Sequence, residues 1–202
     1  MNAVPESRII EPKILYFGTP VVLLTTENLD GTANITPMSS AWALGDRIVL
    51  GLGKGGQGIS NLRERPECVL NLPGPDLWRS VEALAPLTGA DPIPEWKQPL
   101  FRYEKDKFAV AGLTPEASTR VRPPRITECP IQIEAAIRHI SMAGDSTSFA
   151  VVEAQALTVH AHTAIVLDDS HIAPEAWSPL IYNFRHYFGL GPDLGRTFRA
   201  EI

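Results

Sequence analysis

The chain contains few cysteines and no long hydrophobic run. Its 202 residues include two cysteines, Cys68 and Cys129, without the CxxC spacing of a metal or redox motif. Each adjoins an apolar run, so we expect both to be buried structural thiols. No apolar stretch approaches membrane-spanning length, and no hydrophobic segment follows a basic start as in a secretory signal. These absences predict a protein of the reducing cytoplasm with no membrane partner.

Strong charge of either sign is also lacking. The formal net charge is −5 and charged residues make up 20% of the chain, which argues against a general affinity for nucleic acid or anionic membranes. Arg120, Arg122 and Arg125 could form a local basic patch, although the two prolines among them predict an extended surface segment. At 22.1 kDa, with 44% hydrophobic residues, the chain suits one domain over residues 1–202 with a sizeable core.

Short apolar runs separated by turns predict a mainly β fold. Strands are expected at residues 20–28, 34–43, 47–52, 67–72, 131–140 and 146–160. The last two would form a long hairpin around a Gly144-Asp145 turn, with β structure continuing to Asp168, although 131–140 also fits an amphipathic helix. Helices are expected at 76–85 and 105–113, with a long proline-rich loop at 86–104 between them. Because strands and helices do not alternate regularly, an antiparallel barrel or sandwich is favoured over a doubly wound sheet.

The segment at residues 34–42 combines little charge with small hydroxyl side chains. It follows an apolar run and the pair Asp30-Gly31, which predicts a hairpin whose loop is wider than two residues. Thr36, Ser39 and Ser40 would let a ligand approach the backbone and would supply orienting hydrogen bonds. The alternative is an edge strand rich in Ser and Thr that binds nothing. A hydrolase nucleophile is not favoured, since no G-x-S-x-G elbow surrounds either serine.

Five glycines lie within residues 51–58, directly before a helix-like stretch. A glycine-rich backbone exposes its N–H groups, and a helix start presents unpaired donors to an anion. Lys54 would add positive charge beside a bound phosphate. The spacing matches neither a Walker loop nor a dinucleotide-binding fingerprint. Together with the hydroxyl cluster, the loop indicates a site for a flat, phosphorylated cofactor.

One pair of histidines has the spacing of metal ligands. His160 and His162 are two residues apart and, on a strand, would face the same way, with Asp168 or Asp169 as a carboxylate partner. Because no convincing third ligand is evident, we expect a polar surface here and no metal site.

Aromatic residues gather near the end of the chain. His186 and Tyr187 combine a titratable ring with aromatic neighbours, and Arg185 beside them could pair with an acidic ligand. The alternative is a packed aromatic segment without a binding role. The tryptophans, Trp42, Trp78, Trp96 and Trp177, are expected in the core or in an interface.

In order and spacing, residues 20–73 resemble the flavin-reductase-like family of FMN-binding split barrels. Later segments are similar to the same family: Lys107-Phe108, the AGLT stretch at 111–114, Ser118 before PPRITECP, and PLIYNFRHYFGLG near the end. The similarity covers residues 18–195. It implies a Greek-key split β-barrel that forms a homodimer and holds FMN near the dimer interface.

The resemblance also implies positions for the cofactor. The residues bordering the isoalloxazine ring would be Pro37, Met38, Ser39, Ser40, Ala41 and Trp42. Those at the phosphate end would be Lys54, Gln57, Gly58, Ser60 and Asn61. Where the family usually has a threonine, this chain has Gly58, so Ser60 or backbone N–H groups would have to replace the missing hydroxyl. His186 and Tyr187 would lie on the substrate side of the flavin.

The chemistry that the resemblance implies is hydride transfer from NADH or NADPH to flavin. In some members reduced flavin or electrons then pass to a partner monooxygenase or redox protein. Because the flavin carries this chemistry, no side chain is expected to be an essential acid or base. The alternative is a non-catalytic flavin-binding or flavin-sequestering module on the same fold. A pyridoxamine-phosphate-oxidase-like relative is a third reading, disfavoured because its cluster of phosphate-binding Arg and Lys side chains is not evident.

Overall fold

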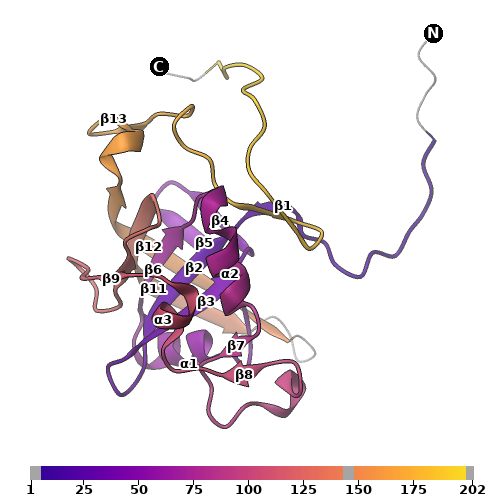
Figure 1. The fold of residues 1–202 in the computed structure, drawn as a ribbon, viewed down its shortest axis with the longest axis vertical. Helices are drawn as coiled ribbons and strands as arrows, with labels where there is room; N and C mark the ends of the chain where they lie inside the picture. Colours follow the sequence, from indigo (N-terminus) through magenta and orange to yellow (C-terminus); the bar gives the residue numbers. More distant parts are fainter. Residues whose placement is uncertain (1–5, 143–147, 199–202) are drawn as a thin grey trace.

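The structure is a computed structural model that describes residues 6–142 and 148–198. Its body is a seven-stranded sheet in the order β3-β2-β6-β11-β12-β5-β4, antiparallel throughout (Figure 1). The strands are β2 (Val22–Glu27), β3 (Ala33–Met38), β4 (Ala41–Leu44), β5 (Arg47–Gly53), β6 (Glu67–Leu72), β11 (Ile131–Met142) and β12 (Phe149–Ala161). The mainly β prediction is therefore confirmed. The expected Gly144-Asp145 turn and the strand start at Ser146 lie outside the described residues.

The opposite edges of the sheet are joined by a connection of two residues. β3 and β4 stand at the two ends of the strand order, yet only Ser39 and Ser40 separate them in the chain. Because so short a connection reaches about 10 Å from one strand to the next, the edges must lie close together and the sheet must curl into a barrel. The Gly51 N–H donates to the Ser40 carbonyl (2.8 Å) beside this crossing. The strand expected at 34–43 is thus two strands on opposite edges.

The long hairpin of β11 and β12 is confirmed, and residues 131–140 form a strand and not a helix. Its ladder runs from the Ile131–Ala161 pair to the Met142–Ala150 pair. His162 still donates to the Pro130 carbonyl (2.9 Å), but proline has no N–H to return, so the ladder stops there. The chain then enters the 3₁₀ turn η3 (Thr163–Ile165), and the prediction of uninterrupted β structure to Asp168 is wrong. A short pair follows, β13 (Val166–Asp168) with β14 (His171–Ile172).

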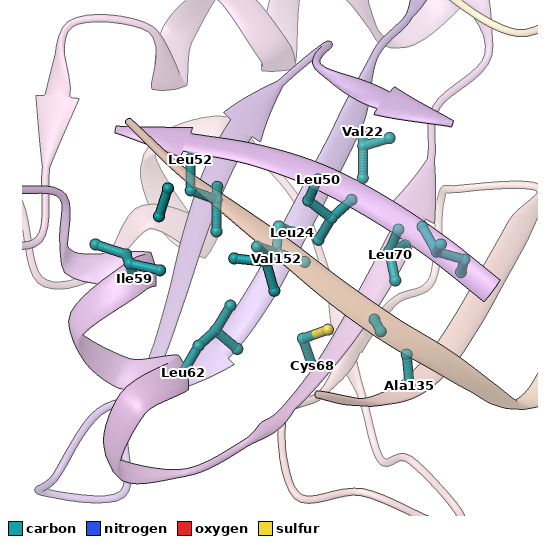
Figure 2. Packing of buried hydrophobic residues seen from close by; sticks show 13 residues of the cluster. Val22, Leu24, Leu50, Leu52, Ile59, Leu62, Cys68, Leu70, Ala135 and Val152 are labelled. Carbon is teal, nitrogen blue, oxygen red and sulfur yellow. The ribbon is translucent and has the colours of Figure 1, made fainter. Parts of the chain in front are cut away.

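The inner face of the curled sheet holds the main apolar cluster, drawn in Figure 2. Helix α1 (Gln57–Glu64) seals this cluster by contributing Ile59 and Leu62. The cluster consists of Val22, Leu24, Ile48, Leu50, Leu52, Ile59, Leu62, Cys68, Leu70, Ala135, Ala150, Val152 and Ala154. The predicted burial of Cys68 is confirmed, and burial raises the pKa of its thiol to about 12.

The outer face of β2 is buried as well. Helices α2 (Trp78–Leu84) and α3 (Lys107–Ala111) cover it and form a second cluster. That cluster consists of Val21, Leu23, Ile35, Val81, Leu84, Leu87, Phe108, Ala111, Leu113, Ile126, Cys129 and Leu180. Burial also raises the pKa of the Cys129 thiol, as expected for a structural cysteine. Because adjacent residues of β2 serve different clusters, its sequence is continuously apolar and does not alternate.

Both predicted helices exist but are shorter than expected. The first begins as the 3₁₀ turn η1 (Pro75–Leu77) and continues as α2, with Val81 and Leu84 buried as predicted. The second starts after Asp106, whose carboxylate accepts from the Ala109 N–H (3.1 Å). It ends at Gly112, which adopts a left-handed conformation with φ +62°.

The segment expected to be a loop at 86–104 contains regular structure of its own. β7 (Leu87–Thr88) pairs in parallel with β8 (Arg102–Tyr103), and η2 (Glu95–Lys97) lies between them. Two further small sheets join distant parts of the chain. β1 (Phe17–Pro20) pairs with β15 (Ile181–Asn183), which pairs with β16 (His186–Phe188), and β9 (Pro115–Glu116) pairs with β10 (Arg125–Ile126). Residues 6–15 extend away from the body (Figure 1).

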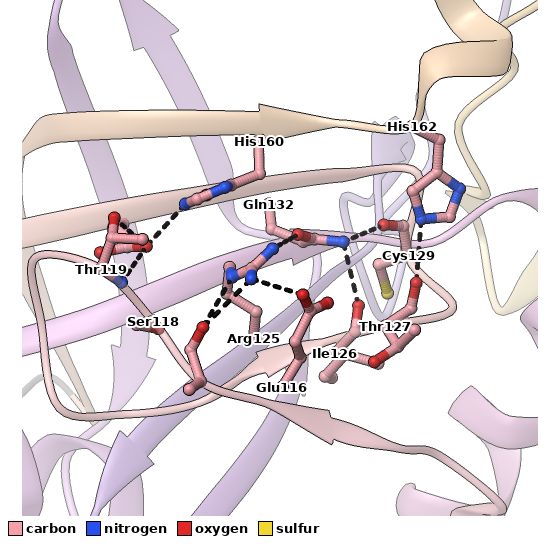
Figure 3. Close-up of polar contacts among 12 residues, drawn as sticks. Glu116, Ser118, Thr119, Arg125, Ile126, Thr127, Cys129, Gln132, His160 and His162 are labelled. Atoms are coloured by element: carbon pink, nitrogen blue, oxygen red, sulfur yellow. Dashed lines mark hydrogen bonds and ion pairs between the residues drawn. The ribbon is translucent and has the colours of Figure 1, made fainter.

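A buried carboxylate fixes the segment around Thr119 to the central hairpin. Glu134 on β11 is 0% exposed and accepts from the backbone N–H groups of Thr119 (2.8 Å), Arg120 (2.5 Å) and Val121 (3.2 Å). It also bonds the His160 ring (2.6 Å), as Figure 3 shows from the His160 side. Burial raises the pKa of Glu134, but these hydrogen bonds outweigh burial, so its pKa lies below the ordinary value.

The possible basic patch is partly absorbed by the same region. Arg125 donates to Glu116 (2.7 Å), Gln132 (2.9 Å) and the Ala117 carbonyl, contacts that Figure 3 also draws. The Arg125 guanidinium is therefore part of the packing, while Arg120 and Arg122 stay exposed.

We predict that Glu134→Ala lowers the free energy of unfolding by about 3–5 kcal/mol, because it leaves several buried N–H groups without an acceptor. The exposed Glu128, which accepts a single bond from the Thr114 N–H, is the matched control, and Glu128→Ala should cost about 1 kcal/mol. Urea denaturation measures both. Since the folded pKa of Glu134 lies below the unfolded one, its contribution is present above the ordinary pKa of 4.5 and is lost as pH falls through the folded pKa. Equal losses for the two variants would contradict the anchoring role.

Candidate functional site

A large hollow, here the glycine-loop pocket, lies where β4 crosses to β5. It has a volume of about 830 Å³ and is lined by Tyr16, Ser40, Gly51, Gly53, Lys54, Gly55, Trp96, Ser148 and Phe149. Two of its glycines are required by close approaches. A Cβ on Gly51 would lie 3.0 Å from the Ser40 Cβ, and a Cβ on Gly55 would lie 2.9 Å from the Trp96 Nε1. The pocket is therefore bounded by bare backbone on one side and aromatic rings on the other.

A second hollow, here the lysine pocket, adjoins the first. It has a volume of about 220 Å³ and is lined by Thr36, Pro37, Gly56, Gln57, Ala85, Leu87, Thr88, Gly89, Trp96, Lys97, Phe101 and Lys107. Trp96 lines both pockets. Lys97 and Lys107 are both buried, and burial lowers the pKa of each. This pocket is cationic, whereas the glycine-loop pocket is mainly aromatic.

A third hollow, here the tyrosine pocket, lies against α2 and the C-terminal sheet. It has a volume of about 510 Å³ and is lined by Tyr16, Val21, Pro37, Met38, Ser39, Val81, Glu82, Ala85, Phe101, Tyr182, Arg185 and Tyr187. The Tyr187 hydroxyl donates to the Glu82 carboxylate (3.0 Å). Burial and the Glu82 charge raise the pKa of Tyr187, so it is a neutral donor at pH 7. Tyr16 borders both this pocket and the glycine-loop pocket.

The residues predicted to border the flavin ring are divided among the pockets. Ser40 lines the glycine-loop pocket, whereas Met38 and Ser39 line the tyrosine pocket. Pro37 lines the tyrosine and lysine pockets. Ala41 packs against the inner cluster, and Trp42 on the edge strand β4 is 58% exposed. The stretch is split because its two halves belong to opposite edges of the sheet.

Several residues predicted at the phosphate end are engaged elsewhere. The Asn61 amide donates to Thr26 (2.9 Å) and to Asn28 (2.9 Å), and the Gln57 amide donates to Asn28 (3.2 Å). Ser60 is exposed and its hydroxyl donates to the Gly56 carbonyl (3.3 Å). The amides of α1 thus join the helix to the β2–β3 hairpin. Gln57 still lines the lysine pocket, and the exposed Lys54 lines the glycine-loop pocket.

Gly58 is buried in α1 directly against β3. A Cβ at this position would lie 2.8 Å from the Thr36 hydroxyl oxygen, closer than real Cβ contacts allow. The Thr36 oxygen accepts from the Asn34 amide (3.1 Å) and also lines the lysine pocket. A hydroxyl is therefore present in this part of the pocket, supplied by the strand instead of the helix.

The two C-terminal candidates are separated in space by the β15–β16 turn. Tyr187 points into the tyrosine pocket, but His186 is exposed and is not among the residues that line the three pockets. Phe184 and Arg185 form the turn with positive φ values of 44° and 70°, and Arg185 reaches the tyrosine pocket.

The histidine pair does not form a metal site. His160 bonds Glu134, and the His162 ring contacts the Thr127 carbonyl (2.9 Å), as Figure 3 shows. Asp168 instead pairs with His171 (2.8 Å). Within residues 6–142 and 148–198 no group of three or more His, Cys, Asp or Glu side chains could hold a metal ion. Among the helices in those ranges, none is long and apolar enough to cross a membrane.

Sequence reasoning missed the side chains that give the pockets their character. Trp96 and Lys97 lie in the segment expected to be a loop, and Tyr16 lies before the first expected strand. Lys107 was noted only as part of the family resemblance. No local pattern marks a lysine as buried, because the neighbours that bury it come from other parts of the chain. Trp42 and Trp96, 58% and 62% exposed, are not in the core.

Comparisons with known proteins agree with this architecture. A family model described as flavin reductase like domain matches residues 14–191. The uncharacterized protein YdfE of Bacillus subtilis (strain 168) is 58% identical over 193 residues, covering 95% of this chain and 93% of that protein. The flavoredoxin of Desulfovibrio vulgaris (Miyazaki F) has a TM-score of 0.80 at 22% identity, over 96% of this chain and 99% of that one. Nitrilotriacetate monooxygenase component B from Bacillus cereus has a TM-score of 0.72 at 17% identity, over 97% and 98%.

The split-barrel fold expected from the sequence is thereby confirmed: solved flavin-reductase-type split barrels share it. Since the family model covers most of the length, the chain belongs to the flavin reductase-like family.

Proposed function

We propose that this protein binds FMN and catalyses its reduction by NADH or NADPH, as a single domain over residues 1–202. The observation that carries the proposal is the contact between two pockets of opposite character. An aromatic pocket bounded by glycine backbone suits a flat ring, and an adjoining pocket with two buried lysines suits a phosphate. This donor set fits FMN in a chain of the flavin reductase-like family.

In this proposal the protein's own residues bind and orient the ring. Tyr16, Trp96 and Phe149 offer aromatic surface in the glycine-loop pocket, while Gly51 and Gly53 let the ring approach the backbone of β5. Ser40 donates to the Tyr16 hydroxyl (3.3 Å), which fixes that ring at the pocket wall. When bound, the flavin supplies the hydride-accepting chemistry. Ala41 and Trp42 would border the site from the edge strand.

The reductant would enter beside the tyrosine pocket. Tyr187 and Arg185 supply a neutral hydroxyl and a cation there, groups suited to a phosphorylated nucleotide. Tyr16 connects this pocket to the glycine-loop pocket. Tyr187 is therefore preferred over the exposed His186 as a substrate-side residue. An electron acceptor such as a partner monooxygenase or redox protein remains part of the proposal, because one similar structure is a monooxygenase component.

We also propose that the protein is a cytoplasmic homodimer. Large apolar side chains are exposed on β1, β4 and β12, namely Phe17 (74%), Trp42 (58%), Leu44 (75%) and Phe149 (43%). A second copy would remove this surface from water. Light scattering should give about twice the mass of 22.1 kDa, and Leu44→Asp should weaken the association. A monomeric mass at micromolar concentration would refute the dimer.

The first measurement is the visible absorbance of the purified protein with FMN, before and after anaerobic NADH or NADPH. We expect a flavin spectrum that bleaches with a rate constant of about 1 s⁻¹ or faster. His186→Ala should leave this rate unchanged, whereas Tyr187→Phe should slow it. Bound flavin that neither nucleotide bleaches would favour the alternative of a non-catalytic flavin-binding module. Failure to bind any flavin would reject the proposal.

The close contact of Gly58 with Thr36 gives a separate prediction. Gly58→Ala should lower the free energy of unfolding by about 1–3 kcal/mol through overpacking, against a gain in helix propensity of about 1 kcal/mol. In a Thr36→Ala background the clash is gone, so the same change should be neutral or stabilising. A double-mutant cycle by urea denaturation measures this coupling. Additive effects of the two changes would show that the contact does not constrain Gly58.

A further inference from the structure

Two lysines are buried in one small cavity. Lys107 is 4% exposed and Lys97 is 9% exposed, and both line the lysine pocket. They come from different elements, since Lys97 ends η2 and Lys107 begins α3. Burying an ammonium group is costly unless its charge is compensated. Two such groups in one cavity of about 220 Å³ therefore need a partner of opposite charge.

Their partners within the described chain are neutral. The Lys97 ammonium donates to the Thr88 hydroxyl (3.1 Å), and the Lys107 ammonium donates to the Asn34 side-chain oxygen and the Ile35 carbonyl, both at 2.9 Å. In residues 6–142 and 148–198 neither ammonium forms an ion pair with a carboxylate. Since an ammonium has three donors, Lys97 has two and Lys107 has one left for a ligand.

The electrostatics of the pocket point the same way. Burial, and then the charge of Lys97, lower the pKa of Lys107 to about 8, against a smaller opposing effect of Glu104. Burial also lowers the pKa of Lys97. The positive charge in the pocket is thus incompletely compensated by the protein, and an anion would restore both ammonium groups to their ordinary protonation.

The position of the pocket suits one end of an elongated ligand. Gly56 and Gln57, at the start of the eight-residue helix α1, form part of its wall, and no side chain caps that helix start. Backbone donors at a helix start favour an anion. Trp96 separates the lysine pocket from the glycine-loop pocket, so a ligand with an aromatic ring and a charged tail would extend past the indole.

We propose that the lysine pocket binds the phosphate monoester of the flavin through the ammonium groups of Lys97 and Lys107, with the flavin ring in the glycine-loop pocket. The inference rests on the proposed function and moves the phosphate away from Ser60 and Asn61, whose side chains bond within the protein. It makes Lys97 the residue that distinguishes FMN from riboflavin, which has the same ring and no phosphate.

The test measures the dissociation constants of FMN and riboflavin by quenching of flavin fluorescence. Lys97→Met keeps the apolar stem over Trp96 and Phe101 but removes the charge. It should weaken FMN binding by about tenfold to a hundredfold, the loss expected for a charged hydrogen bond, and should change riboflavin binding by about twofold or less. Lys97→Arg, which keeps the charge, should retain the preference for FMN.

Two further lysines provide matched controls. Lys105 is exposed and pairs with Asp30 (2.8 Å), so Lys105→Met makes the same change in net charge and should leave both constants unchanged. Lys54 borders the glycine-loop pocket, so Lys54→Met should shift FMN and riboflavin together. Riboflavin binding by each variant also shows that the ring pocket is intact.

Each outcome separates this inference from the function on which it rests. If the wild type binds both flavins but Lys97→Met and Lys105→Met bind FMN equally, the inference is overturned and the proposed function stands. If Lys54→Met alone removes the preference for FMN, the phosphate lies at the glycine loop and the inference is again overturned. If the wild type binds neither flavin, the proposed function fails and the inference fails with it.

Discussion

The arrangement of this protein depends on the two residues that carry the chain from one edge of its sheet to the other. Because only Ser39 and Ser40 join β3 to β4, the sheet has to close on itself, and the glycines of β5 have to leave room for the crossing. The same closure places the start of α1 beside the end of β3 and sets the segment from Trp96 to Phe101 over both. The three pockets all border this crossing, so their positions follow from the connection more than from any single side chain.

The sequence predicted those elements whose signals are local. β6 was expected at residues 67–72 and is found there, and the hairpin of β11 and β12 was recognised from two apolar runs and a turn. The break at Ser39 could not be foreseen, since it reflects which distant strand pairs with each half and not a breaker residue. The stop after Ala161 did have a local cause, Pro130, but it lies on the partner strand. Sequence patterns report on a strand's own residues and not on its partner's.

The candidate site was predicted in outline but not in its charges. Ser40, Lys54 and Gln57 line pockets, whereas Asn61 and Ser60 bond within the fold and His186 faces solvent. Lys97 and Lys107 resemble surface lysines in the sequence, because their burial arises from residues of β3, β7 and α2 that are far away in the chain. Charges buried by distant contacts are the part of a site that a linear pattern cannot display.

The indole of Trp96 illustrates a consequence of the shared wall between the pockets. It is seated on Gly55, where any larger residue would displace it, its ring lies 5.1 Å from the Lys97 ammonium, and it is 62% exposed to water. A ligand spanning both pockets would change the polarity around this one ring at once. The emission of Trp96 is therefore an internal optical reporter of occupancy, and one that requires no label.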